Sequence, residues 1–200
     1  MRLKKNLYIN RIINICFIAA LLISIGYQFI TITYATQNQA NPDFIITIND
    51  NGSISNTGSL FGKDLWYPSM EKDGIIRIYN NFKKVKVTGM GLNITLNDYQ
   101  REYSRDEVMN SFLNSMELTL EKGKFLIFQQ KILDRVKFSQ LVNNSMNDIF
   151  KGYILEKPHS FNISKSDFID LKYTLRMDIS AGPETQNIDA SVEFIFEFEE

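Results

Sequence analysis

The sequence predicts an all-β fold, an antiparallel β-sandwich with one or two short helices, preceded by a hydrophobic N-terminal segment. Three observations predict it. Apolar and polar residues alternate with a period of two in several runs, as in strands that bury one face. Residues typical of turns separate these runs. The chain of 200 residues is 44% hydrophobic and 12% aromatic, which is a folding composition rather than a disordered one.

Residues 1–35 are predicted to be a signal peptide or a membrane anchor. A cationic leader, "MRLKKNLYINR", precedes the apolar run "IINICFIAALLISIG". Thr33 and Ala35 are small residues at the positions that a signal peptidase reads, so we expect cleavage after Ala35. The alternative is an uncleaved anchor, because residues 12–34 are long enough to cross a hydrocarbon core of roughly 30 Å. In either case the rest of the chain is exported to the cell surface or beyond.

Charge and cysteine content exclude other classes of protein. Four of the 22 lysines and arginines lie in the leader, which leaves 18 cations against 23 acids in the rest of the chain. Nucleic acid is therefore not an expected partner, because phosphate contacts need clustered cations. The dense basic stretch "NNFKKVKV" alternates lysine with valine and is interpreted as a solvated strand face. Cys16 is the only cysteine, so no disulfide supports the exported part, which depends on its hydrophobic core.

Residues 36–42, "TQNQANP", are predicted to be a flexible joint, and residues 43–200 the sandwich domain. The domain begins with the strand "DFIITIN". The apolar face of that strand consists of Phe44, Ile46 and Ile48. "NGSISNTGS" is expected to be a turn-rich connector, with an Asn-Gly turn rather than a calcium site. "GIIRIYNN" is expected to be the next strand, with its isoleucines on one face and Arg77 on the other.

The middle of the domain contains strands and one clear helix signal. "KVKVTGMGLNITLN" is expected to be two alternating runs joined by a bulge or bend at Gly89–Met90–Gly91. Ser104 and Glu107 form a capping-box pattern that predicts a helix over about residues 105–114. "MELTLEKGKFLIFQQKIL" is expected to be a hairpin that turns at Lys122–Gly123. One helical turn over 138–142 and a long loop are expected next.

The last two strands alternate most regularly. "DFIDLKYTLRMDI" is expected to present its leucines and Tyr173 on one face, and the loop "SAGPETQ" connects it to "NIDASVEFIFEFEE". In the final strand Phe194, Phe196 and Phe198 share a face opposite acidic residues. We expect these three phenylalanines to lie in the core against a second sheet, where each contributes roughly 1.5–3 kcal/mol.

This ending resembles that of the TasA/camelysin family of exported bacterial proteins. The family's last two strands typically flank a small-residue loop close to "AGNEYQG". The matching residues here are Ala181, Gly182, Glu184 and Gln186, and the residues that differ are Pro183, Thr185 and Asn187. Asn187 stands where the family tends to have glycine. "DLWYPSMEKDGIIRIYNN" is similar to a family stretch with Pro-Gly and then a strand that ends in Asn, and here Ser69 stands where glycine is usual.

The resemblance implies a jelly-roll β-sandwich outside the cell. For some members it also implies assembly into matrix fibres, in which an N-terminal strand of one subunit completes the sheet of the next. The candidate assembly strand here carries Phe44, Ile46 and Ile48, because it follows the flexible joint and could add to an exposed sheet edge. The alternative is that this strand pairs within its own domain. We expect an exported structural protein of the cell envelope or extracellular matrix, whose partners are itself or related envelope or matrix proteins.

Two alternative functions have weaker support in the sequence. Some relatives are labelled zinc metalloproteases, but catalytic zinc generally takes three protein ligands, and His159 is the only histidine. Neither an H-E-x-x-H nor a G-x-S-x-G motif is present, so we expect no catalytic residue, metal ligand or cofactor. A carbohydrate-binding module could use Trp66 and Tyr67 as a stacking platform. The simpler interpretation is that Trp66 is buried in the core.

Overall fold

The computed structural model describes residues 18, 22–23, 41–62, 66–125, 128–143 and 150–199, with the side chains of 124–125 and 128–129 left out. Pro42–Glu200 forms one compact unit and Met1–Asn41 another. The predicted signal or anchor, its cleavage position Ala35 and the candidate span 12–34 lie outside the described residues, apart from three helical positions, and so do residues 36–40 of the predicted joint. Within the described part of the chain, no helix is long and apolar enough to cross a membrane.

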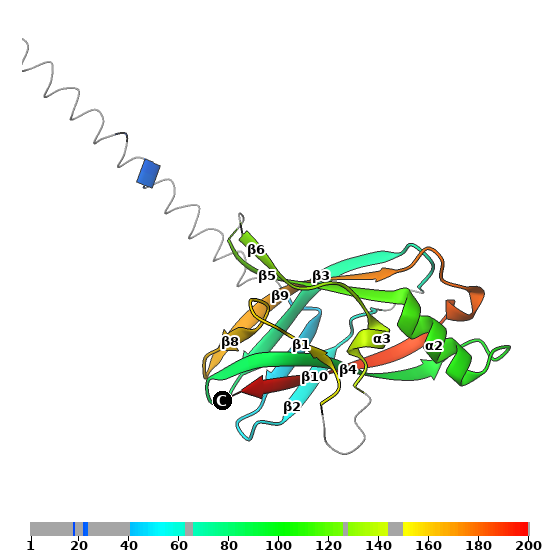
Figure 1. Cartoon of the computed structure of the whole chain (residues 1–200), viewed down its shortest axis with the longest axis horizontal. Coiled ribbons are helices and arrows are strands. Elements are labelled where there is room, and N and C mark those ends of the chain that lie inside the picture. The colour runs from blue at the N-terminus through cyan, green and yellow to red at the C-terminus, as the bar shows by residue number, and fades with distance from the viewer. Residues whose placement is uncertain are drawn as a thin grey trace, which may run out of the picture. The chain divides into compact units, whose positions relative to one another are not determined.

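The described strands form two sheets in which nearly all neighbours are antiparallel (Figure 1). The larger sheet has six strands in the order β2 (Ile54–Gly58), β1 (Phe44–Ile48), β3 (Glu71–Asn80), β9 (Asp167–Met177), β5 (Met116–Phe125) and β6 (Phe128–Lys137). The smaller sheet has the order β10 (Asp189–Glu199), β4 (Val85–Asp98) and β7 (Tyr153–Ile154), and β8 (Phe161–Ile163) also pairs with β4. The exception to antiparallel pairing is β1 with β3, which run parallel. The prediction of a mainly β protein is confirmed.

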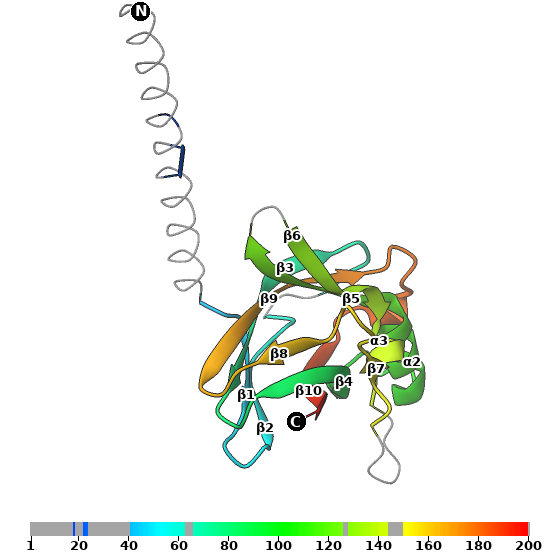
Figure 2. The same ribbon diagram turned by 60° about the vertical axis from the view of Figure 1, so that its left-hand side comes forward.

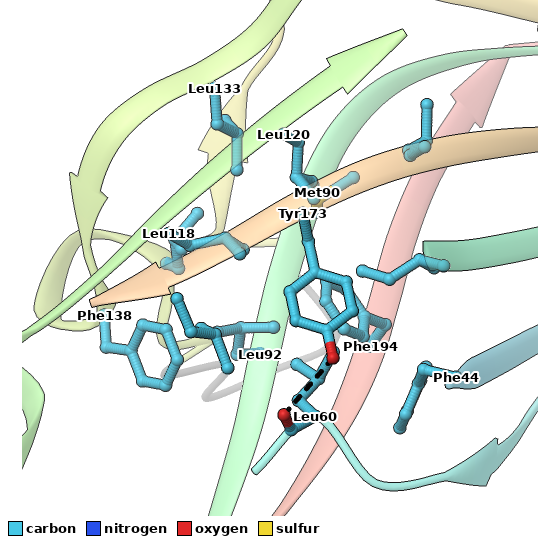
Figure 3. Close-up of a cluster of buried hydrophobic side chains, with 14 of the residues drawn as sticks. Phe44, Leu60, Met90, Leu92, Leu118, Leu120, Leu133, Phe138, Tyr173 and Phe194 are labelled. Carbon is cyan, nitrogen blue, oxygen red and sulfur yellow. Dashed lines mark hydrogen bonds between the residues drawn. The ribbon is translucent and has the colours of Figure 1, made fainter. Parts of the chain in front are cut away.

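The core lies on the inward faces of strands from both sheets (Figure 3). The last two strands belong to different sheets, since β9 pairs with β3 and β5 whereas β10 pairs with β4. Phe194 of β10 meets Phe44 of β1 edge to face, with ring centroids 5.5 Å apart. Phe194 and Phe196 are buried as predicted, and Phe198, nearer the end of its strand, is partly buried.

Tyr173 of β9 is the largest fully buried side chain of this core. Its hydroxyl donates a hydrogen bond to the backbone carbonyl of Leu60 at 3.5 Å (Figure 3). Burial raises the pKa of Tyr173 to about 12, because an apolar environment disfavours the charged phenolate. The phenol therefore stays neutral and remains a hydrogen-bond donor over the physiological range of pH.

Two short helices, α2 (Arg105–Ser115) and α3 (Phe138–Leu141), lie side by side at one end of the sheets (Figures 1 and 2). The Ser104 hydroxyl accepts a hydrogen bond from the Glu107 N–H at 3.2 Å, which confirms the predicted start of α2. The helices contribute Phe112 and Phe138 to an aromatic cluster that also contains Phe61 and Trp66. This cluster closes one end of the core.

Two predicted connections are wrong. The stretch expected to be a connector contains β2, which pairs with β1 along five residues after a turn at Asn49–Ser53. Its Ser, Asn, Thr and Gly residues favour turns, but pairing with β1 holds them extended. The hairpin of β5 and β6 does not turn at Lys122–Gly123, because these residues pair with Gln130 and Gln129. The strands continue to Phe125 and Phe128, since aromatic residues favour extended structure.

Residues 84–97 contain two alternating runs joined by a bulge, as predicted, because the buried side chains change from Val85 and Val87 to Met90, Leu92 and Leu96. Both runs belong to the single strand β4, whose register against β10 shifts at Thr88, next to the expected position. The ring of Phe150 requires glycine at position 89, because a Cβ there would lie 2.6 Å from it. The predicted long loop that follows α3 contains β7, and β8 begins directly after it at Phe161. Both strands are too short for periodicity to reveal.

Three described residues outside the strands, Ser69, Ser166 and Asn187, have a left-handed backbone without being glycine. Ser69 has φ 71° and lies just before β3, and Asn187 has φ 55° and lies just before β10. The Ser69 N–H donates to the carbonyl of Met177 at 3.1 Å, which fixes the first of these turns against β9. A side chain with a Cβ costs roughly 1–2 kcal/mol in this conformation, and Asn tolerates it better than other residues.

Ser69→Gly is therefore expected to raise the free energy of unfolding by about 0.5–1 kcal/mol, after the extra chain entropy of glycine is subtracted. Asn187→Gly is expected to give a smaller gain, because asparagine already tolerates positive φ. Urea unfolding followed by circular dichroism measures both. Ser191→Gly, within strand β10, is the matched control and should destabilise the protein. A Ser69→Gly variant no more stable than the parent would contradict the expectation.

Candidate assembly site

The predicted assembly strand is β1, and its three apolar residues lie in the core. Phe44, Ile46 and Ile48 expose 2%, 0% and 0% of their surface. β1 pairs antiparallel with β2 along its whole length and parallel with β3, from Phe44 opposite Ile76 to Ile48 opposite Asn80. In the single chain, β1 is therefore an inner strand of the larger sheet, the second of the two arrangements that the sequence left open.

The start of β1 is fixed by Asp43, which bonds the neighbouring strand twice. Its N–H donates to the carbonyl of Ile75, and its carboxylate accepts from the N–H of Ile75, both at 2.9 Å. Two glycines make room for it. A Cβ on Gly74 would lie 2.2 Å from the Asp43 carboxylate, and a Cβ on Gly58, which has φ 103°, would lie 2.2 Å from its carbonyl oxygen. The strand therefore enters the sheet at one defined position.

The outer edge of β10 is held by a side chain instead of a strand. Asn56 of β2 donates its amide N–H to the carbonyl of Phe194 at 3.3 Å and accepts the N–H of Phe194 at 3.2 Å. A backbone neighbour would make the same pair of bonds. Asn56 thus joins the two sheets and occupies the middle of an edge that a second chain would need.

Other described edges also carry features that hinder pairing. β2 has only five residues, and the register of β6 shifts near Arg135, whose φ is 51°. The outer face of β10 is acidic, with Glu193 bonded to Asn93 and Glu199 paired with Lys86. Short edge strands, bulges and charges all limit edge-to-edge association. These features disfavour the addition of a strand from another chain at β2, β6 and β10.

The remaining candidate residues do not converge on a catalytic arrangement. His159 is exposed, and its Nδ1 lies 2.7 Å from the carbonyl oxygen of Lys131. Among the described residues, no group of three or more His, Cys, Asp and Glu side chains is arranged to hold a metal ion. The predicted cleavage residue Ala35 lies outside them.

Trp66, the main residue of the alternative carbohydrate-binding platform, is buried. Trp66 is 3% exposed, its Nε1–H donates to the carbonyl of Phe61 at 3.3 Å, and the two rings meet edge to face. It is a core residue that cannot stack on a ligand without unfolding its surroundings. Tyr67 is 60% exposed, but the buried Trp66 cannot form a stacking platform with it.

Sequence reasoning did not find Asn56 or Asp43 as residues of this site. Asn56 lies in a stretch of turn-forming residues, and its bond partner is 138 positions away. Asp43 gave no signal apart from its position before a strand. Comparison of the chain with protein-family models and with curated proteins found no match.

Proposed function

We propose that the protein is an exported structural protein of the cell envelope or extracellular matrix, a relative of the TasA/camelysin family that assembles by exchanging β1 between copies. Its partners would be other copies of itself or related envelope and matrix proteins. Signal peptidase would act after Ala35, and without that cleavage residues 12–34 would hold the protein at the membrane. The proposal depends mainly on the position of β1, an apolar strand that directly follows residues 36–42, the predicted flexible joint. No short turn enforces its pairing with β3.

A jelly-roll β-sandwich is the architecture that we propose for the two sheets. The shared core supports it, because Phe44 of one sheet contacts Phe194 of the other. The family assignment is supported by two positions where the family has glycine. Ser69 and Asn187 occupy them here, and both have the left-handed backbone that glycine adopts most easily. Asn80, at the family's strand-ending asparagine, is fully buried and donates to the carbonyl oxygens of Lys83, Ile163 and Ser164.

Exchange of β1 is favoured by its connections. Parallel neighbours need a crossover instead of a tight turn, and here β2 and residues 59–70 separate β1 from β3. β1 would leave together with β2, because the two strands are paired along five residues. The same hairpin from a second copy would restore every contact, and such exchange of an identical element is a low-cost route to association. If each copy gives its hairpin to one neighbour and receives a hairpin from a different neighbour, the series of exchanges stays open and forms a fibre, whereas reciprocal exchange between two copies would close as a dimer.

A reversible cross-link between β1 and β3 tests the proposal. Thr47 and Tyr79 are opposite each other in the two strands, so Thr47→Cys with Tyr79→Cys can hold β1 on its own sheet. Without residues 1–35 the protein has no other cysteine. Monomer that is oxidised first should remain monomeric at high concentration, whereas reduced protein should form fibres in electron microscopy. Oxidation after assembly should join neighbouring subunits covalently.

The matched control is a second cysteine pair in the smaller sheet. Thr95 and Ser191 are opposite each other in β4 and β10, and the pair Thr95→Cys with Ser191→Cys should leave assembly unchanged when oxidised. The proposal fails if the oxidised Thr47–Tyr79 variant assembles as well as the reduced one. It also fails if the reduced protein stays monomeric under every condition in which fibres are sought.

A further inference from the structure

A small hollow lies on the outer face of the larger sheet, away from the core and from β1. Its volume is about 170 Å³, and it is lined by Glu71, Glu117, Thr119, Lys131, Asp134, Arg135, Thr174 and Arg176. Its floor follows the strand register, in which Arg176 of β9 lies between Glu71 of β3 and Glu117 of β5. In the next row Thr174 lies beside Thr119. These two short side chains leave space between longer charged ones.

The β6 strand forms one wall of the hollow through its bulge. Arg135 has φ 51°, and its N–H donates to the Thr119 hydroxyl oxygen at 3.1 Å. Its Nε–H donates to a Glu117 carboxylate oxygen at 2.8 Å. Lys131 and Asp134 pair at 2.8 Å in the same strand. A strained backbone held by two bonds therefore fixes the wall in place.

The charges of the lining balance, and among the described residues two of them form no ion pair with another residue of the hollow. One of the two, Arg176, attracts Asp178 outside the hollow and helps, after the hydrogen bonds from Ser180, to lower the pKa of that carboxyl. The hollow contains three cations and three acids, and Arg135 pairs with Glu117 as Lys131 does with Asp134. Within the part of the chain that the structure describes, neither Arg176 nor Glu71 has an ion pair or side-chain hydrogen bond. Arg176 is partly buried, and Glu71 is exposed beside it. One positive and one negative group are thus available at neighbouring positions.

The two threonines of the hollow offer one hydrogen-bond donor and one hydrogen-bond acceptor. The Thr119 oxygen accepts from Arg135, so its O–H remains able to donate. The Thr174 O–H donates to the carboxylate of Asp73, so its oxygen remains able to accept. The free groups of the hollow therefore suit a ligand that carries both an acidic and a basic group.

We infer that this hollow binds a small zwitterion, a free α-amino acid. Its carboxylate would receive two parallel hydrogen bonds from Arg176, the geometry that guanidinium groups favour. Its ammonium group would lie against Glu71. A simple anion or cation would leave one of the two charges unpaired, and the volume is below the roughly 300–1,000 Å³ of sites for drug-sized ligands. Binding there is independent of the proposed assembly, since β1 does not line the hollow.

The test is a two-dimensional NMR titration of the ¹⁵N-labelled full-length chain with the twenty standard L-amino acids. At least one should give saturable shifts in the amides around Thr119, Arg135 and Arg176. Arg176→Gln should raise its Kd by about tenfold or more, because a charge-assisted pair of hydrogen bonds is lost. The corresponding amine and the corresponding acid, which each lack one charged group, should bind more weakly than the amino acid.

Arg101→Gln is the matched control, because Arg101 is exposed, pairs with Asp98 and does not line the hollow. It should leave the Kd unchanged. Glu71→Gln provides a second variant on the exposed side of the hollow, so that the result does not depend on how well Arg176→Gln folds. The inference is overturned if no amino acid gives saturable shifts, or if the shifts persist with the same Kd in both variants.

Discussion

Replacing Asp170 with alanine is expected to lower the free energy of unfolding by about 3–5 kcal/mol. Asp170 of β9 accepts two hydrogen bonds from Arg77 of β3, from Nε and from Nη2, each at 2.7 Å. The two side chains expose only 10% and 11% of their surface. Removal of the carboxylate would leave a charged guanidinium nearly buried without its main partner, which is among the most costly changes in a folded protein.

The surroundings of Arg77 make this cost hard to avoid. The guanidinium lies 4.5 Å from the ring centroid of Phe168 and 6.0 Å from that of Tyr79. In the parent protein the hydrogen bond to Asp170 raises the pKa of Arg77 further above its ordinary value. Without that bond arginine still keeps its proton, so Arg77 does not avoid the cost by becoming neutral. It would have to leave its position beside these two aromatic rings to reach water.

Urea unfolding of Asp170→Ala measures the effect, with Asp134→Ala as the matched control. Asp134 pairs with Lys131 at a similar distance, 2.8 Å, but the two side chains are 60% and 51% exposed. Exposed pairs contribute about 0–1 kcal/mol, so the control should change stability little. Equal losses in the two variants would contradict the assignment of Asp170 as half of a buried pair. The double variant Arg77→Met with Asp170→Leu should recover much of the loss.

Ile46→Ala is expected to lower the free energy of unfolding by about 2–5 kcal/mol, the usual cost of truncating a fully buried isoleucine. Ile46 lies at the centre of β1 with 0% exposure, and a cavity there would face the core. Ile45→Ala is the control, because Ile45 has the same side chain one position earlier and is only partly buried on the opposite face. It should cost clearly less.

The dependence on protein concentration adds information about β1. In a monomer that uses its own β1, the loss caused by Ile46→Ala is independent of protein concentration, whereas in an exchanged assembly stability rises with concentration. Measuring both variants over a wide range of concentration separates the two states. If Ile45→Ala proves as costly as Ile46→Ala, the register that places Ile46 inward is wrong.

The strands that the sequence predicted best are long and two-sided. In β9 and β10 each inward residue is apolar over many positions, and a shift of one residue would expose all of them to water. Their alternation therefore carried enough information to predict both the strands and the buried faces of Phe194 and Tyr173. The start of α2 was equally predictable, because the hydrogen bond from the Glu107 N–H to Ser104 joins residues only three positions apart.

The parts that sequence reasoning missed depend on contacts between distant segments. β2 is extended because β1 lies beside it, although its own residues favour turns. The hollow around Arg176 depends on a bulge in β6 and on strands from four parts of the chain. No short pattern encodes such a meeting of residues, so neither the bond of Asn56 nor the pairing of Arg135 could be predicted.

The hydrogen bonds between Asn56 and Phe194 couple the opening of the larger sheet to the edge of the smaller one. Asn56 belongs to the β1–β2 hairpin, while Phe194 belongs to the last strand of the other sheet. Departure of the hairpin would uncover the side of β3 and, in the same movement, the middle of β10. The hairpin that arrives from a neighbour carries its own Asn56 and would cover both surfaces together, so each opened molecule would offer one composite binding site that spans the two sheets.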